Sequence, residues 1–198
     1  MTKMRGFTLA EVMITLAVLG ILASIMLPAV SRVRPNENKV MFKKAYYIAE
    51  RTVSELVNDE NLYPEGDGTH VGLDNLSEVT YNGEKFTGND KFCKLFAEKV
   101  NTINDSVNCV SSSSNPTASN IPSFTTTDGI AWYMPITDFS ADKFITVDVN
   151  NEKKPNCSFA NNTCINPDRF EIYIEPDGKM YVKGVKEKEY LSSNKSMQ

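Results

Sequence analysis

The chain has 198 residues, of which 41% are hydrophobic and 23% are charged, and its formal net charge at pH 7 is −4. This length fits one compact domain together with a separate apolar segment. The acidic balance argues against general nucleic-acid binding, because such binding needs clustered Lys and Arg, and the lysines beyond the apolar segment are interspersed with acids.

An apolar segment, Phe7 to Val30, dominates the amino-terminal part of the chain. It is 24 residues long and carries one charge, Glu11. A helix of this length extends ~36 Å, and the hydrocarbon layer of a membrane is ~30 Å thick, so the segment is predicted to span a membrane. The residues before it include Lys3 and Arg5 and no acid. The positive-inside bias therefore predicts a single-pass protein with a cytoplasmic amino terminus and an exported carboxyl-terminal domain, in the periplasm or at the cell surface.

The junction at Gly6 has a specific pattern. Gly6 is followed by F-T-L-A-E, which places Glu11 five residues after the glycine. With the short basic leader and the apolar helix, this pattern resembles the type IV prepilin family, including the pseudopilins of type II secretion. The resemblance is close over about the first 34 residues and extends to the rest only in layout.

The resemblance implies several partners and roles. A prepilin peptidase would cleave between Gly6 and Phe7 and methylate the new amino terminus of Phe7. The helix would then polymerise with other pilin or pseudopilin subunits on an inner-membrane assembly platform. Glu11 would pair with the charged Phe7 amine of a neighbouring subunit, because a carboxylate in lipid needs a partner. The alternative for Glu11 is a protonated acid at the membrane edge.

Three other interpretations of the apolar segment stay open. Ala29-Val30-Ser31 matches the cleavage site of an ordinary secretory signal, although the apolar run is longer than a usual signal core and contains an acid. A plain membrane anchor would not require Gly6 before Phe7. A buried core helix would be unusually long without charge.

A second helix is predicted from Asn36 to Asp59. Pro28 and Pro35 are expected to kink the helical region, since each removes a backbone donor. The resemblance favours one long, bent helix, and the alternative is that Pro35 opens a separate one. The apolar face expected to pack on a sheet recurs at a spacing of three and four residues: Phe42, Ala45, Tyr46, Ala49, Val53, Leu56 and Val57.

The middle of the chain is expected to be mostly loop. Leu62–Asn89 is rich in Gly, Asn and Asp, with a short strand near Glu78–Tyr81. Asp90 can cap a short helix that runs to about Val100. Asn101–Thr127 is polar and predicts a surface loop.

The last third predicts strands, because it is rich in β-branched and aromatic residues. The expected strands are Ile130–Ile136, Phe144–Val149, Phe170–Glu175 and Lys179–Lys183, with a hairpin turn at 176–178. The segment DVNNEKKPN and the hairpin after it also resemble, more loosely, the carboxyl-terminal pattern of pilin-like secretion proteins. The predicted fold is therefore α+β and pilin-like: a long amino-terminal hydrophobic helix whose second half packs on a small antiparallel sheet, with disulfide-tied loops.

These elements suggest four parts of the chain. Residues 1–6 form a cleaved leader, and 7–30 form the transmembrane and polymerisation helix. Residues 31–60 form the soluble half of the helix, and 61–198 form a globular head.

The four cysteines lie on the side predicted to be exported, where disulfides persist. Of the three possible pairings we favour the two local ones, Cys93 with Cys109 and Cys157 with Cys164. Their spacing lacks the C-x₂-C pair of a typical Cys₄ zinc site.

Sites for catalysis or metal binding are weakly indicated. His70 lies in a glycine-rich loop without a nucleophile at a known spacing, so no enzyme is expected. No cofactor is expected, except that Asp148, Asn150 and Asp168 offer oxygen ligands that could suit calcium.

The sequence therefore predicts a structural subunit, a pilin or pseudopilin, of a type IV pilus or a type II secretion pseudopilus. The alternatives are a minor pilin at a filament tip that binds a surface or DNA, and an anchored exported protein of another function.

Overall fold

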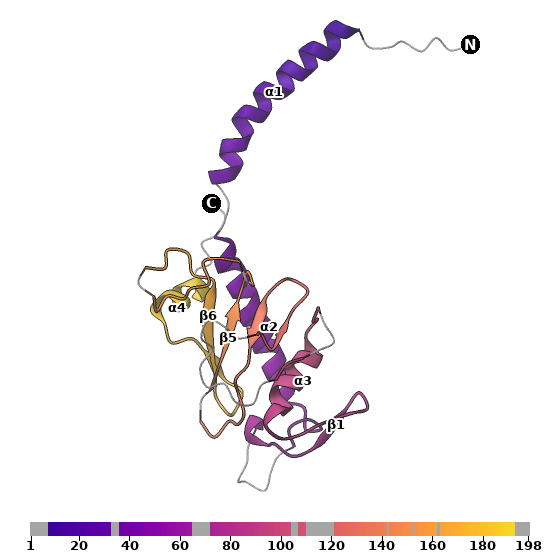
Figure 1. Cartoon of the computed structure of the whole chain (residues 1–198), viewed down its shortest axis with the longest axis vertical. Helices are drawn as coiled ribbons and strands as arrows, with labels where there is room; N and C mark the ends of the chain where they lie inside the picture. Colours follow the sequence, from indigo (N-terminus) through magenta and orange to yellow (C-terminus); the bar gives the residue numbers. More distant parts are fainter. Residues whose placement is uncertain are drawn as a thin grey trace, which may run out of the picture. The chain divides into compact units, whose positions relative to one another are not determined.

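A computed structural model describes residues 8–32, 36–64, 72–103, 107–109, 121–141, 143–151, 153–161 and 163–192, without the side chains of 25–32. The chain divides into two compact units, residues 1–37 and 38–198. The first unit contains helix α1 (Leu9–Arg32), drawn in indigo in Figure 1. We call residues 38–198 the head unit.

The head unit is α+β, as predicted. Its helix α2 (Glu37–Val57) begins at the unit boundary and packs against an antiparallel sheet with the order β3-β4-β5-β6-β7. Neighbouring strands follow one another along the chain, so the sheet is a simple meander (Figure 1). The strands are β3 (Phe124–Thr125), β4 (Ala131–Tyr133), β5 (Lys143–Asp148), β6 (Arg169–Ile174) and β7 (Met180–Tyr181).

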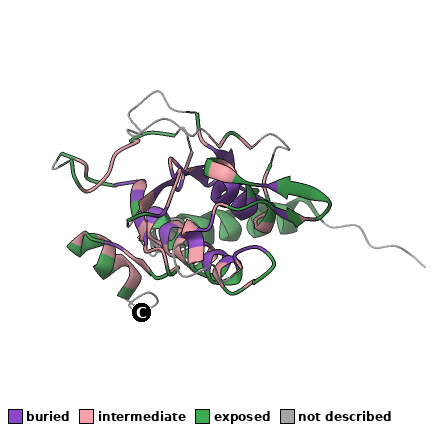
Figure 2. Ribbon diagram, turned by 90° about the horizontal axis from the view of Figure 1, so that it is seen from below, coloured by how far each residue is buried: buried purple, intermediate pink, exposed green. Residues whose placement is uncertain are grey.

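The apolar face of α2 explains its place on the sheet. Phe42 is fully buried, and its ring stacks on Phe170 of β6 with 4.1 Å between centroids. Side chains alternate along a strand, so Ile172 and Ile174 lie on the same face as Phe170, and both are fully buried. Burying each such side chain contributes roughly 1.5–3 kcal/mol. Figure 2 shows this buried layer in purple. The predicted helix and its inward face are confirmed.

The chain between α2 and the first strand of the sheet forms a smaller part of the head unit. Strands β1 (Val79–Tyr81) and β2 (Glu84–Phe86) form a hairpin, flanked by the short 3₁₀ helices η1 (Gly72–Asp74) and η2 (Gly88–Asp90). Asn82 and Gly83 at its tip have φ values of 52° and 85°, as a two-residue hairpin turn with the favoured twist requires. Helix α3 (Lys91–Lys99) joins this part to the core, because the ring of Phe96 packs against Trp132 of β4, with 5.4 Å between the ring centroids.

Some elements differ from the sequence-based expectation. Strand β3 lies in the region predicted as surface loop, and β2 in the glycine-rich region. Helix α4 (Val185–Ser192) was not predicted. The helix predicted after Asp90 is present as α3, and Asp90 occupies its N-cap position, but within the described residues the expected side-chain capping bond is absent there. The Asp90 carboxylate instead lies 3.6 Å from the Lys94 ammonium.

Candidate functional site

The described side chains of α1 present an apolar surface on every side. Its exposed large hydrophobic residues are Leu9, Val12, Met13, Ile14, Leu16, Val18, Leu19, Ile21 and Leu22. They occupy successive positions around the helix, so none of its faces is polar. A helix of this kind is typical of an apolar environment or of close packing with other apolar helices. Within the part of the chain that the structure describes, no helix has both the length and the hydropathy of a membrane span.

Glu11 takes part in the start of α1. The Thr8 backbone N–H donates to Glu11 Oε2 at 2.8 Å, and the Glu11 N–H donates to Thr8 Oγ1 at 3.3 Å. The Thr8 hydroxyl also donates to Glu11 Oε2, at 2.9 Å. Thr8 and Glu11 therefore form a capping box, which satisfies two amides at a helix start that would otherwise lack partners. The spacing T-x-x-E before an apolar run in the sequence is the signal for this motif.

The other residues predicted at the amino terminus are only partly described. Gly6, Phe7 and Pro35 lie outside the described residues. Pro28 lies within α1, but its side chain is not described. Helix α1 ends at Arg32 and helix α2 begins at Glu37, and residues 33–35 of the segment between them are not described. The prediction of one bent helix is therefore not tested.

The head unit contains two disulfides. Cys93 bonds to Cys109 and Cys157 bonds to Cys164, with 5.8 and 6.0 Å between their Cα atoms. These are the two local pairs favoured from the sequence. The first bridge ties α3 to the segment before β3, and the second closes a small loop between β5 and β6.

The three residues considered for calcium lie together at the ends of β5 and β6. Asp148 and Asp168 are fully buried. Arg169 donates through Nε to Asp148 Oδ2 at 2.9 Å. The Asn150 amide donates to Asp168 Oδ2 at 3.1 Å, and Asn150 Oδ1 is buried without a partner among the described residues.

Protein donors occupy the carboxylates of this cluster. Asp168 also accepts the backbone N–H groups of Asn156 and Cys157, at 2.8 and 2.7 Å. Burial raises the pKa of Asp148, although Arg169 opposes this shift. Within the described residues, no group of three or more His, Cys, Asp or Glu side chains is placed to hold a metal. The cluster fixes the Cys157 loop to the sheet, and calcium binding stays a prediction.

Lys91 is a buried cation that no sequence pattern indicated. It has no exposed surface; its ammonium donates to the Asn75 carbonyl at 2.8 Å and lies 4.3 Å from the centroid of the Tyr63 ring. Burial lowers the pKa of Lys91 to about 8 and raises the pKa of Tyr63. Lysine is rarely buried, so a lysine on a predicted helix would normally be placed at the surface.

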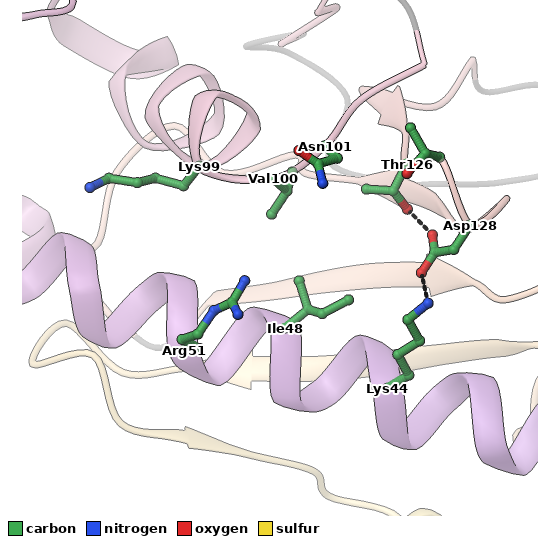
Figure 3. A pocket seen from close by; sticks show the side chains of 9 residues that line it. Lys44, Ile48, Arg51, Lys99, Val100, Asn101, Thr126 and Asp128 are labelled. Atoms are coloured by element: carbon green, nitrogen blue, oxygen red, sulfur yellow. Dashed lines mark hydrogen bonds and ion pairs between the residues drawn. The ribbon is translucent and has the colours of Figure 1, made fainter.

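A charged groove lies on the flank of α2. It has a volume of about 340 Å³ and is lined on one side by α2 and on the other by the end of α3 and the loop before β4 (Figure 3). Its main charged and apolar residues are Lys44, Ile48, Arg51, Lys99, Val100 and Asp128. Lys44 pairs with Asp128 at 2.8 Å. Burial acts to raise the pKa of Asp128, but hydrogen bonds from Lys44 and Thr126 outweigh it, and the pKa is lowered.

The amino-terminal pattern has a match among known families. Residues 1–27 match the prokaryotic N-terminal methylation motif, so the chain carries the type IV prepilin-like signature. This motif implies pilin-type assembly with a peptidase and with other pilin subunits, and its family is structural rather than enzymatic. No curated protein and no solved structure gives a significant match to the chain.

Proposed function

We propose that this protein is a pilin or pseudopilin: a structural subunit that a prepilin peptidase cleaves between Gly6 and Phe7 and methylates at Phe7. The mature subunit spans the membrane through its apolar helix and exports the head unit. It then polymerises through that helix on an assembly platform, into a type IV pilus or a type II secretion pseudopilus.

The proposal rests on the overlap of a family motif with an apolar helix. The methylation motif covers residues 1–27, and the helix within it is apolar on every described side except for one acid, Glu11. Lipid tails are as apolar as the helix, so apolar contact alone gives little drive for helices to associate in a membrane. A pair between Glu11 and the Phe7 amine of a neighbour would supply direction and fix the axial stagger of the subunits.

Processing is tested on protein extracted from membranes. Amino-terminal sequencing and mass spectrometry should give a methylated Phe7 as the first residue. Gly6→Leu should leave unprocessed precursor in the membrane, because a bulky side chain would occupy the cleavage position. A mature chain that began at Arg32 would instead identify an ordinary signal peptide and end the proposal.

Assembly is tested with variants that separate the two uses of the Glu11 carboxylate. Thr8→Ala removes the capping hydroxyl and keeps the charge, whereas Glu11→Gln removes the charge and keeps an acceptor for the Thr8 N–H. We expect Glu11→Gln and Glu11→Val to be processed and inserted normally but to be depleted from sheared filaments. Thr8→Ala should assemble much better than either.

The readout is electron microscopy of sheared fractions beside immunoblots of the membrane pool. Glu37→Gln is the matched control, because Glu37 is an exposed acid in the first turn of α2. Glu11→Val makes insertion easier, so its loss of assembly could not be attributed to poor insertion. Normal assembly of both Glu11 variants would show that Glu11 is only a tolerated charge.

A further inference from the structure

The groove on the flank of α2 has an excess of positive charge. Lys44 and Arg51 come from α2, seven residues apart, and Ile48 lies between them on the same face. Lys99 comes from the last turn of α3. The groove is therefore lined by three cationic side chains and one acid, Asp128. In Figure 3 the Lys99 side chain extends away from Lys44 and Asp128, so its ammonium has to swing toward Arg51 to reach a ligand shared with it.

Asp128 is already neutralised within the head unit. Lys44 binds Asp128 Oδ2 at 2.8 Å, and the Thr126 hydroxyl donates to Asp128 Oδ1 at 2.6 Å. The Trp132 indole donates to that same Thr126 hydroxyl at 3.2 Å, which holds this side of the groove to the core. Lys44 and Asp128 thus form one wall, and the surplus charge belongs to Arg51 and Lys99.

The contacts of Arg51 and Lys99 leave their donors accessible. Arg51 Nε lies 3.7 Å from Glu55, and both side chains are exposed, so this pair contributes little. The Lys99 ammonium lies 5.0 Å from the centroid of the Tyr81 ring, a contact that does not use its hydrogen-bond donors. A guanidinium matches a carboxylate with two parallel hydrogen bonds, and Ile48 and Val100 offer an apolar floor for the methylene groups of an acidic side chain.

The acidic net charge of the chain makes a second copy of this chain a fitting occupant of the groove. Each copy carries a formal charge of −4 at pH 7, and cleavage after Gly6 would remove Lys3 and Arg5 and leave −6. Copies packed side by side therefore repel one another unless opposite charges meet at their contacts. We propose that this groove is a contact between subunits, in which Arg51 and Lys99 bind an acidic side chain from the head unit of a second copy of this chain. The inference rests on the proposed function, since polymerisation is what places the copies together.

The experiment uses the full chain in assembled filaments. Arg51→Gln with Lys99→Gln removes both surplus charges and should reduce the protein in the sheared fraction roughly tenfold, the effect of losing one charge-assisted contact. The matched control is Lys43→Gln with Lys94→Gln, which makes the same charge change on the same two helices outside the groove. Buried Trp132 reports by its fluorescence whether each variant is folded.

A photo-crosslinking residue in place of Ile48 identifies what enters the groove. We expect covalent dimers in filaments and none in the dispersed membrane pool, with mass spectrometry placing the crosslink beside an Asp or Glu of the head unit. A crosslink to lipid or to a different protein would overturn the inference, and so would normal assembly of the Arg51 and Lys99 double variant. If the wild-type chain formed no filaments, the proposed function itself would fail, so the two failures are distinguishable.

Discussion

Replacing Lys91 with methionine measures what a buried cation does to the stability of the head unit. Burial lowers the pKa of Lys91 to about 8, from about 10.5 in an exposed lysine. Between these two values the unfolded chain binds more protons than the folded chain, so stability rises with pH over this range. The wild-type protein should gain about 2 kcal/mol of unfolding free energy between pH 7 and pH 9.5.

Lys91→Met should remove this rise. At pH 7 two effects oppose one another: the variant no longer buries a charge, but the Asn75 carbonyl loses its donor, which costs about 1–3 kcal/mol, and the cation–π contact with Tyr63 is lost. At pH 9.5 wild-type Lys91 is mostly neutral and makes no cation–π contact, so only the loss of the donor to the Asn75 carbonyl remains. The variant should therefore be close to wild type at pH 7 and clearly less stable at pH 9.5.

The assay is urea unfolding of the full chain in detergent micelles, followed through the fluorescence of Trp132. Trp132 is the single tryptophan of the chain and is fully buried, so its signal reports on the head unit. Lys94→Met, a change at an exposed position of the same helix, is the control and should keep the wild-type pH dependence. Parallel stability profiles for wild type and Lys91→Met would refute the reasoning, because Lys91 would then titrate like an exposed lysine.

Three further changes test the packing of the head unit. Phe42→Ala should lower the unfolding free energy by about 3–5 kcal/mol, because it leaves a cavity against Phe170; a cost below 1 kcal/mol in the urea assay would contradict the stacking. Gly178→Ala should destabilise the hairpin between β6 and β7, because φ is +86° and an added Cβ would lie 2.7 Å from Val57 Cγ2; an unchanged melting temperature would contradict this. Reduction of both disulfides should lower the melting temperature visibly, as bridges closing loops of this size typically contribute ~2–4 kcal/mol each; an unchanged melting temperature on adding reductant would contradict that contribution.

The sequence predicted the helices and strands whose apolar residues recur at a regular spacing. The stripe that includes Phe42 and Leu56 repeats at helical spacing, and Phe170, Ile172 and Ile174 alternate as a half-buried strand does. The missed elements lack such patterns. Strand β3 is two residues long among serines and threonines, and β2 carries Glu84 and Lys85, so tertiary contacts rather than propensity decide their pairing.

The candidate functional residues also differ in how far the sequence alone can indicate them. Gly6, Phe7 and Glu11 have fixed spacing in one short stretch, so a single sequence can indicate them. The groove combines Arg51 with Asp128, which are far apart in the chain, and only the folded arrangement brings them together. Lys91 was missed because burial of a lysine depends on a carbonyl and an aromatic ring from other segments.

The capping box at Thr8 and Glu11 means that the Glu11 carboxylate already has hydrogen-bond partners before any subunits associate. The Glu11 carboxylate already accepts two hydrogen bonds within its own helix. If Glu11 binds the amine of a neighbour, as the proposed function requires, these bonds would weaken or rearrange, so the step would be an exchange of partners rather than a net gain of one. In the proposed filament, a subunit that returned to the membrane could therefore restore its own helix start, because Glu11 would again accept from Thr8.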